Sequence, residues 1–212
     1  MDLFYSSASL NWISEAFLWI VAKYIEIIAT VTGIIYLMYS ILGDKKLWLY
    51  GLISSGLYVY ICFVAGIYAD MGINIYYVLV SIYGWIHWTV YKETSTKEIP
   101  YSKTKFIEAI YLLFVTIGLY IALVFILKRF TNSTVPYLDS FTTAASITAT
   151  WMLARKMIEH WLIWIVVDAV SVGLYIYKDL YPTSFLFAVY TILAISGYIT
   201  WKKEWKLQER IL

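Results

Sequence analysis

The feature that most constrains this chain is a series of long apolar segments separated by short polar ones. A membrane-spanning helix needs roughly 20 consecutive apolar residues, whereas a barrel strand needs about 10 with alternating polarity. The alternation is absent, and the apolar runs are as long as spanning helices require. We therefore predict an all-α membrane protein with seven transmembrane helices, at residues 20–42, 47–66, 71–91, 106–127, 137–154, 161–177 and 181–201.

Composition leaves little of the chain for anything outside a lipid bilayer. Of the 212 residues, 62% are hydrophobic and 14% are charged, whereas soluble domains carry about 25% charged residues. This excludes a separate soluble enzyme domain, and the net charge of +2 gives no reason to expect nucleic-acid binding. One cysteine and two histidines are too few for an internal disulfide or a structural metal site, so we expect no metal and no cofactor.

Residues 1–19 are predicted to be an N-terminal interfacial segment rather than a full span. Glu15 interrupts the apolar residues 10–20, which is typical of a helix that lies in the membrane interface and runs into the first span. The start of the chain also lacks the basic residues of a cleaved signal peptide.

The distribution of basic residues predicts the orientation of the chain. In membrane proteins with short loops, lysine and arginine accumulate on the cytoplasmic side. The connections after the first, third and fifth predicted helices, together with the C-terminal tail, hold twelve basic residues, whereas the opposite side holds Lys128, Arg129 and Lys178. We therefore expect a multi-pass protein with its N-terminus outside and its C-terminus in the cytoplasm.

The chain also repeats itself weakly. When residues 24–88 are aligned without gaps on residues 137–201, which we call the repeat alignment, twelve positions are identical. They include the pairs Trp48/Trp161, Gly84/Gly197 and Trp88/Trp201. Because one unpaired helix separates two three-helix units, both units have the same orientation. We predict two parallel three-helix repeats joined by a linker helix, a 3+1+3, SWEET-like arrangement whose ligand site lies near the membrane midplane between the halves.

The repeat and the apolar segments together predict how the chain is divided. The parts are the interfacial segment 1–19, a first three-helix repeat 20–92, a linker with the fourth helix 93–130, a second three-helix repeat 131–202 and a cytoplasmic tail 203–212. The sequence leaves open whether copies of the chain associate into a homo-oligomer.

The sixth predicted helix carries the most informative candidate site. Asp168 lies about 14 Å from the start of this helix, near the centre of the bilayer, where a carboxylate costs at least about 2.5–3.5 kcal/mol. Trp161, Trp164 and Asp168 are spaced i, i+3 and i+7, so they share one helical face. Two indoles leading to an acid suit a flat cationic ring. The alternatives are that Trp161 is an interfacial belt residue and that Asp168 pairs internally with a hydroxyl or amide.

The third predicted helix carries a second polar and aromatic stripe. Asn74, Tyr77 and Ser81 follow helical spacing and are candidate substrate-binding residues. The alternative is that this stripe is packing scaffold, since Tyr77 recurs in the second repeat.

The two repeats differ where the candidate site lies. Trp164 and Asp168 align with Gly51 and Ser55, so the second repeat has large functional side chains where the first has small ones. We expect such a site to lie off the pseudo-symmetry axis and to fit one asymmetric ligand.

Four motifs give the chain a resemblance to a known family. They are Tyr-Gly-Trp-x-x-Trp at 83–88, Trp-x-x-Trp-x-x-x-Asp at 161–168, Gly-Leu-Tyr-Ile-Tyr-Lys at 173–178 and Gly-Tyr-Ile-Thr-Trp-Lys at 197–202. With these motifs, residues from about 20 to 205 resemble the PnuC family of bacterial vitamin transporters. The family's aromatic pair and its asparagine or aspartate map onto Trp161, Trp164 and Asp168.

The resemblance implies a function and its setting. It implies facilitated uptake of nicotinamide riboside, a vitamin B3 precursor, through the bacterial inner membrane by rocking of two three-helix bundles. Phosphorylation by a cytoplasmic vitamin kinase traps the product, so neither ATP hydrolysis nor ion coupling is needed. Some members resemble thiamine transporters, and thiamine is also a cationic heteroaromatic, so the motif specifies a small-molecule cationic aromatic vitamin better than it specifies which one.

Two other classes of function fit the sequence less well. An intramembrane enzyme would need a catalytic arrangement such as Gly-x-Ser-x-Gly, paired aspartates or His-Glu-x-x-His, which the predicted spans lack. A seven-helix photoreceptor would need a mid-helix lysine for retinal, and the seventh predicted helix has none before Lys202.

Overall fold

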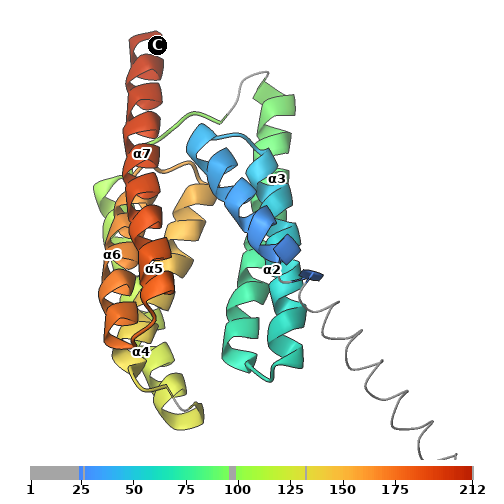
Figure 1. Cartoon of the computed structure of the whole chain (residues 1–212). Helices are drawn as coiled ribbons and strands as arrows, with labels where there is room; N and C mark the ends of the chain where they lie inside the picture. Colours follow the sequence, from blue (N-terminus) through green and yellow to red (C-terminus); the bar gives the residue numbers. More distant parts are fainter. Residues whose placement is uncertain (1–23, 26, 96–98, 132, 212) are drawn as a thin grey trace, which may run out of the picture.

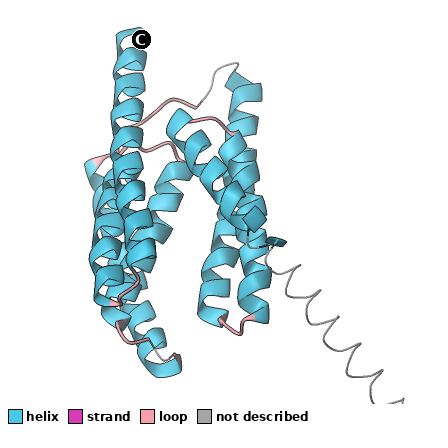
Figure 2. Ribbon diagram, viewed as in Figure 1, coloured by secondary structure: helices cyan, strands magenta, loops and turns pink. Residues whose placement is uncertain are grey.

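The computed structural model describes residues 24–25, 27–95, 99–131 and 133–211. In these ranges the chain forms seven helices and no β-sheet (Figures 1 and 2). The helices are Ile27–Leu42, α2 Lys46–Val64, α3 Tyr68–Ser95, α4 Phe106–Phe130, α5 Pro136–Ala154, α6 His160–Tyr177 and α7 Tyr181–Ile211. The predicted all-α fold with seven helices is therefore confirmed, whereas the interfacial segment 1–19 lies outside the described residues.

The helices form two groups that lie side by side (Figure 1). One group contains the helix Ile27–Leu42, α2 and α3, and the other contains α4 to α7, in which α5 packs against α4 and α6, and α6 packs against α7. Contacts between α3 and α5 join the groups. We call residues 27–95 the first half and residues 136–211 the second half, with α4 between them in sequence.

The helices differ in length, in hydropathy and in how far they are buried by other helices. By length and hydropathy, α2, α4, α6 and α7 are each able to cross a membrane, and the helix Ile27–Leu42 is apolar but shorter. With 19 residues, α5 is about 28 Å long and is rich in alanine, serine and threonine. Small side chains let α5 pack closely among its neighbours, and ten of its residues are buried. High hydropathy is thus not required of a helix that other helices shield from lipid.

One end of the bundle, the upper end in Figure 1, carries most of the described basic residues, and we call it the basic end. The basic side chains described at this end lie in the turn before α2, in the connections before α4 and α6, and in the last turns of α7: Lys45, Lys46, Lys103, Lys105, Arg155, Lys156, Lys202, Lys203, Lys206 and Arg210. The opposite end has Lys128, Arg129 and Lys178.

The final helix is longer than the apolar pattern predicts. The apolar segment ends at residue 201, but α7 continues to Ile211 and projects beyond the other helices at the basic end (Figure 1). The loop before α4 holds this extension, because the backbone N–H of Tyr101 donates to Oε1 of Gln208 at 2.9 Å. The Lys103 ammonium also lies 3.8 Å from the centre of the Trp205 ring.

A tryptophan packed on a glycine holds together the second and third helices of the first half. The Trp48 ring lies directly over Gly84, where a Cβ atom would overlap the indole. It also meets the ring of Trp88 edge-on, with centroids 5.5 Å apart and an interplanar angle of 89°. Glycine is required at position 84 because the indole occupies the space of a side chain.

The second half has the same arrangement at the residues that the repeat alignment pairs with these. The Trp161 ring lies over Gly197, again in the space of a Cβ atom, and meets the ring of Trp201 at 87° with centroids 5.9 Å apart. The paired residues identified in the sequence thus make equivalent contacts in both halves.

The turns of the two halves also correspond. The described non-helical turns contain four residues with positive φ, namely Gly43 at 67°, Lys156 at 52°, Gly66 at 71° and Asp179 at 57°. The repeat alignment pairs Gly43 with Lys156 and Gly66 with Asp179. In all four turns the next residue's N–H donates to the carbonyl five residues earlier, at 2.9 to 3.1 Å, which is the pattern of a Schellman cap.

Candidate ligand-binding site

A large cavity lies between the two halves. It has a volume of about 390 Å³ and is lined by the helix Ile27–Leu42, α2, α6 and α7, with Leu153 from the end of α5. Its aromatic lining comprises Tyr36, Tyr58, Trp161, Trp164, Phe187 and Tyr190, and its polar lining includes Thr30, Ser40, Ser54 and Asp168. The volume and the mainly aromatic lining are those of a small-molecule site.

A smaller cavity adjoins the large one and is rich in hydroxyl groups. It has a volume of about 160 Å³, and its lining includes the hydroxyl-bearing residues Tyr36, Ser54, Ser55, Tyr77, Ser81 and Thr150. Gly33, Tyr36, Ser54 and Trp164 line both cavities. A ligand with an aromatic part and a hydroxylated part therefore has a compartment of suitable chemistry for each.

The structure brings together the three candidate residues of the sixth predicted helix. Trp161, Trp164 and Asp168 all line the large cavity from α6. Trp161 is only 2% exposed and packs on Gly197, which does not agree with an interfacial belt residue. The face predicted from the i, i+3 and i+7 spacing therefore points into the bundle.

Asp168 supplies the negative charge of the large cavity. Its side chain is 5% exposed, and the described residues give it neither a hydrogen bond nor an ion pair. The alternative that Asp168 pairs internally thus finds no partner in the described part of the chain. A buried carboxylate needs a compensating charge or donor, so the cavity favours a cationic ligand.

The candidate residues of α3 separate into two kinds. Tyr77 and Ser81 line the smaller cavity, and Ser81 is buried. Asn74 lines neither cavity, and its Nδ2 donates to the backbone carbonyl of Asp70 at 2.9 Å. Asn74 lies about one helical turn farther from the basic end than Tyr77, beyond the reach of the cavities.

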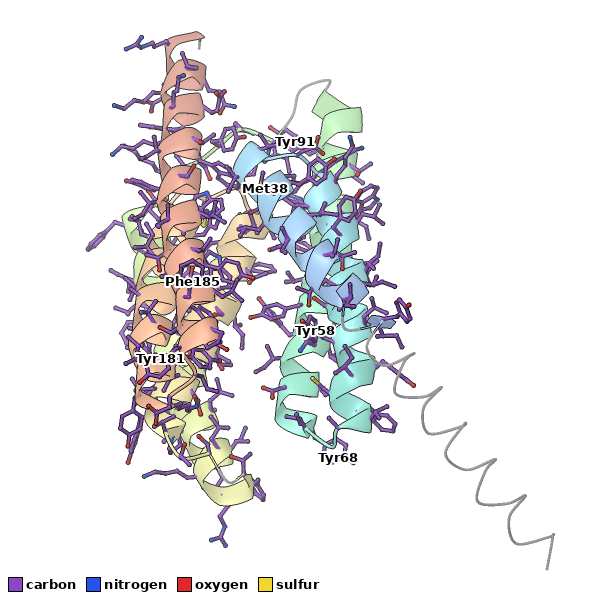
Figure 3. The ribbon with its side chains drawn as sticks, viewed as in Figure 1. Met38, Tyr58, Tyr68, Tyr91, Tyr181 and Phe185 are labelled. Atoms are coloured by element: carbon purple, nitrogen blue, oxygen red, sulfur yellow. The ribbon has the colours of Figure 1, made fainter. Side chains whose placement is uncertain are left out.

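Several lining residues were not predicted from the sequence. Tyr36, Tyr58 and Tyr190 line the large cavity, and Tyr58 projects from α2 toward the other helix group (Figure 3). Tyr190 is the repeat counterpart of the candidate residue Tyr77, so the repeat alignment could have identified it. Tyr36 and Tyr58 carry no comparable signal in a chain with 21 tyrosines.

The position of Tyr36 depends on a glycine of α2. A Cβ atom at Gly51 would lie 2.9 Å from Cδ2 of Tyr36, so the tyrosine ring occupies the space next to α2 that a side chain would fill. Because Tyr36 borders both cavities, Gly51 sets how the two compartments are divided.

The arrangement as a whole defines the class of protein. A helical bundle with membrane-spanning helices and a mid-bundle cavity between two similar halves is the architecture of a membrane transporter. The chain matches the family described as nicotinamide mononucleotide transporter over residues 23–203. It therefore belongs to this family and is a multi-pass membrane transporter, not an enzyme.

Characterised relatives and a solved structure are consistent with this membership. The chain is 24% identical to the nicotinamide riboside transporter PnuC of Escherichia coli K12, over 84% of this chain and 85% of that protein. It is 28% identical to PnuC of Neisseria mucosa, covering 83% and 71%. It is 25% identical to the riboflavin/roseoflavin transporter RibM of Streptomyces davaonensis, covering 95% and 94%.

The fold is also that of a solved member of the family. The crystal structure of the vitamin B3 transporter PnuC matches with a TM-score of 0.68 and 25% sequence identity, covering 93% of this chain and 88% of that chain. The predicted resemblance to the PnuC family is therefore confirmed.

Proposed function

We propose that this protein is a facilitative transporter that imports nicotinamide riboside across the bacterial cytoplasmic membrane. The observation that carries the proposal is the buried Asp168 carboxylate, which lines an aromatic cavity and has no described partner. Nicotinamide riboside has a positively charged pyridinium ring, which supplies the missing charge. Relatives named as nicotinamide riboside transporters support the same substrate.

The two cavities fit the two parts of this substrate. The pyridinium ring would lie on Trp161 and Trp164 with its charge toward Asp168, because indole faces attract cations. The ribose hydroxyls would enter the smaller cavity and contact Tyr77 and Ser81. Asn74, which lines neither cavity, stays a prediction from the sequence alone.

Transport is proposed to occur by alternating access between two parallel three-helix repeats, residues 20–92 and 131–202, with α4 as the linker in 93–130. The equivalent tryptophan–glycine contacts and positive-φ turns at paired positions of the repeat alignment support this division. A rocking motion of one half against the other would open the cavity to each side in turn. No ATP hydrolysis or ion coupling is proposed, because phosphorylation by a cytoplasmic vitamin kinase would trap the product.

The basic end is proposed to face the cytoplasm. The positive-inside rule supports this orientation, since ten described basic side chains lie at the basic end and three at the other. The C-terminus would then be cytoplasmic and the N-terminus outside.

Thiamine is the second candidate substrate, favoured by the same charge complementarity to Asp168. Thiamine has a cationic thiazolium ring but no ribose, and its single hydroxyl group, on a short ethyl chain, can pair with fewer hydroxyl groups of the smaller cavity than a ribose can. Those hydroxyl groups favour the riboside.

Uptake into proteoliposomes tests the proposal. Purified protein is reconstituted and supplied with radiolabelled nicotinamide riboside, thiamine, riboflavin or nicotinamide mononucleotide, with empty liposomes as the control. We expect nicotinamide riboside to enter fastest, and the mononucleotide to be disfavoured because its phosphate brings negative charge toward Asp168. Preferential uptake of thiamine or riboflavin would identify the other vitamin as the substrate, and no uptake above empty liposomes would contradict the proposal.

A further inference from the structure

Two buried indole groups cross from one half to the other at the basic end. Trp88 of α3 donates its Nε1–H to the carbonyl of Ala154, the last residue of α5, at 2.9 Å. Trp201 of α7 donates its Nε1–H to the carbonyls of Ser40 and Ile41, at 3.0 and 3.1 Å. An indole of each half thus donates to the first helix of the other half.

The acceptor carbonyls are equivalent in the two halves. The repeat alignment pairs Ile41 with Ala154, and each lies in the last turn of its helix, where carbonyls have no donor within the helix. The Schellman turns satisfy the carbonyls one and two residues earlier. The indole N–H of the opposite half is therefore the donor that completes each helix end.

These hydrogen bonds lie directly against the basic-end side of the large cavity. Ser40 and Leu153, which are also paired in the repeat alignment, line the cavity. One acceptor is the carbonyl of Ser40 itself, and another belongs to the residue after Leu153. Trp88 and Trp201 are 4% and 0% exposed, so both indoles are buried beside the residues that line this end of the cavity.

Tyr101, from the loop before α4, and Lys156, from the turn between α5 and α6, each pack against one of the two indoles. The Tyr101 ring packs against the Trp201 ring, with centroids 4.9 Å apart. The Lys156 ammonium lies 4.4 Å from the centre of the Trp88 ring and 4.8 Å from that of Tyr101. Tyr101 and Lys156 therefore connect the two crossing hydrogen bonds, and loosening either indole affects contacts of the other.

We propose that Trp88 and Trp201 are the gating residues of the basic end. Their indole hydrogen bonds form a latch that holds the halves together and keeps the cavity closed toward that end. Release of substrate on this side requires the hydrogen bonds of both indoles to break. The inference rests on the proposed function, in which the cavity holds the substrate and the basic end faces the cytoplasm.

Thiol accessibility measures the latch directly. Ser40 is replaced by cysteine in a Cys62→Ser background, and a membrane-impermeant maleimide is applied to the basic-end side of inside-out vesicles. Trp88→Phe and Trp201→Phe keep an aromatic ring at each position but remove the N–H donor. Because one hydrogen bond contributes a net change of about two- to tenfold in equilibrium, we expect each change to raise the labelling rate by about 2- to 10-fold, and the double variant to exceed both.

Trp48→Phe is the matched control. Trp48 is equally buried and touches the Trp88 ring, but its Nε1 has no hydrogen-bond partner among the described residues. We expect Trp48→Phe to leave the labelling rate unchanged. A rise equal to that of the two latch variants would show that loosened packing, not the crossing hydrogen bonds, controls access, and would overturn the proposal.

A nicotinamide riboside titration on the same proteins separates the latch from the proposed function. Latch variants that bind within about twofold of the parent are folded, and unchanged labelling in both would then overturn the latch alone. If the parent does not bind nicotinamide riboside, the proposed function fails while labelling still tests the latch.

Should a phenylalanine variant not fold, Lys156→Gly tests the contact of Lys156 with the Trp88 and Tyr101 rings, because glycine accepts the positive φ while the ammonium is lost. Faster labelling is expected, and an unchanged rate would count against the latch.

Discussion

The two halves of this transporter have the same backbone turns and the same tryptophan–glycine contacts, yet they contribute different side chains to the cavities. The second half places Trp164 and Asp168 in the large cavity. The first half places their counterparts Gly51 and Ser55 in the smaller one. The shared tryptophan–glycine pairs thus maintain helix packing, whereas the residues that differ make the two cavities chemically distinct.

The difference is one of size as well as charge. In the first half a large Tyr36 fills the space beside the small Gly51. At the corresponding positions of the second half, a small Ala149 accompanies the large Trp164. Because large and small residues are exchanged between equivalent positions, the aromatic rings come from different helices in the two halves, Tyr36 from the helix Ile27–Leu42 and Trp164 from α6. An asymmetric ligand is accommodated without changing the helical frame.

The largest effect is expected from removing the Asp168 carboxylate, which corresponds to the uncharged Ser55 in the first half. Asp168→Ala should weaken nicotinamide riboside binding by about 30-fold or more, because loss of one member of a desolvated charge pair costs more than about 2 kcal/mol. Isothermal titration calorimetry measures this change. Ser55→Ala, at the equivalent position, is the control and should cost less than about tenfold. Equal losses from the two changes would mean that the halves contribute equally to binding.

The next effect distinguishes packing from binding. Gly197→Ala and Gly84→Ala both insert a methyl group into an indole, so each should destabilise the protein by about 1–3 kcal/mol. Only Gly197→Ala should also weaken ligand binding, because Trp161 lines the large cavity and Trp48 lines neither. Thermal unfolding and a binding titration on both variants test this. Weakened binding in Gly84→Ala alone would reverse the roles assigned to the halves.

A smaller effect is expected from the hydroxyl groups of the first half. Ser81→Ala should weaken binding of nicotinamide riboside by about 2- to 10-fold, the contribution of one hydrogen bond. It should not alter binding of the N-methylnicotinamide cation, which has the charged ring without ribose. Ser171→Ala is the control, because Ser171 is buried in α6 but bonds to the carbonyl of Val167. Equal weakening of both ligands would place the ribose elsewhere.

The smallest effect concerns an ion pair at the end of the second half opposite the basic end. Lys178 and Asp139 lie 3.5 Å apart with side chains 28% and 29% exposed, and the counterpart of Lys178 in the first half is Ala65. Lys178→Ala makes this position equivalent in the two halves and should cost less than about 1 kcal/mol of unfolding free energy. The melting temperature measures the change. A larger loss would show that this end depends on a charge the first half lacks.

The sequence predicts the helices better than it predicts their ends. The apolar runs and the polar segments between them locate all seven helices, although among the described helices α2, α4, α6 and α7 are the ones long and apolar enough to cross a membrane. The extension of α7 to Ile211 is not marked by hydropathy, because outside the membrane the helix is held by contacts such as the one between Tyr101 and Gln208. These contacts join residues far apart in the chain and have no local signal.

The cavity lining is predictable where helical spacing and membrane depth combine. Asp168 stands out because a carboxylate at mid-membrane is costly, and helical spacing then places Trp161 and Trp164 beside it. Tyr36 and Tyr58 line the same cavity through tertiary packing, which one helix's spacing does not reveal. Asn74 has the right helical spacing but lies too far along α3 to reach a cavity. Position along the helix, and not helical spacing alone, therefore determines which residues line a cavity.

The length of α7 places its C-terminal end far from the rest of the bundle. Its 31 residues span about 46 Å, whereas the hydrocarbon core is about 30 Å thick, so the last turns stand well clear of the lipid. Because Trp201 lies at the crossing of the two halves, any tilt of α7 about that point is amplified at the tip near Arg210. A fluorophore attached there would report the motion of the second half from the aqueous phase, at a site remote from the ligand.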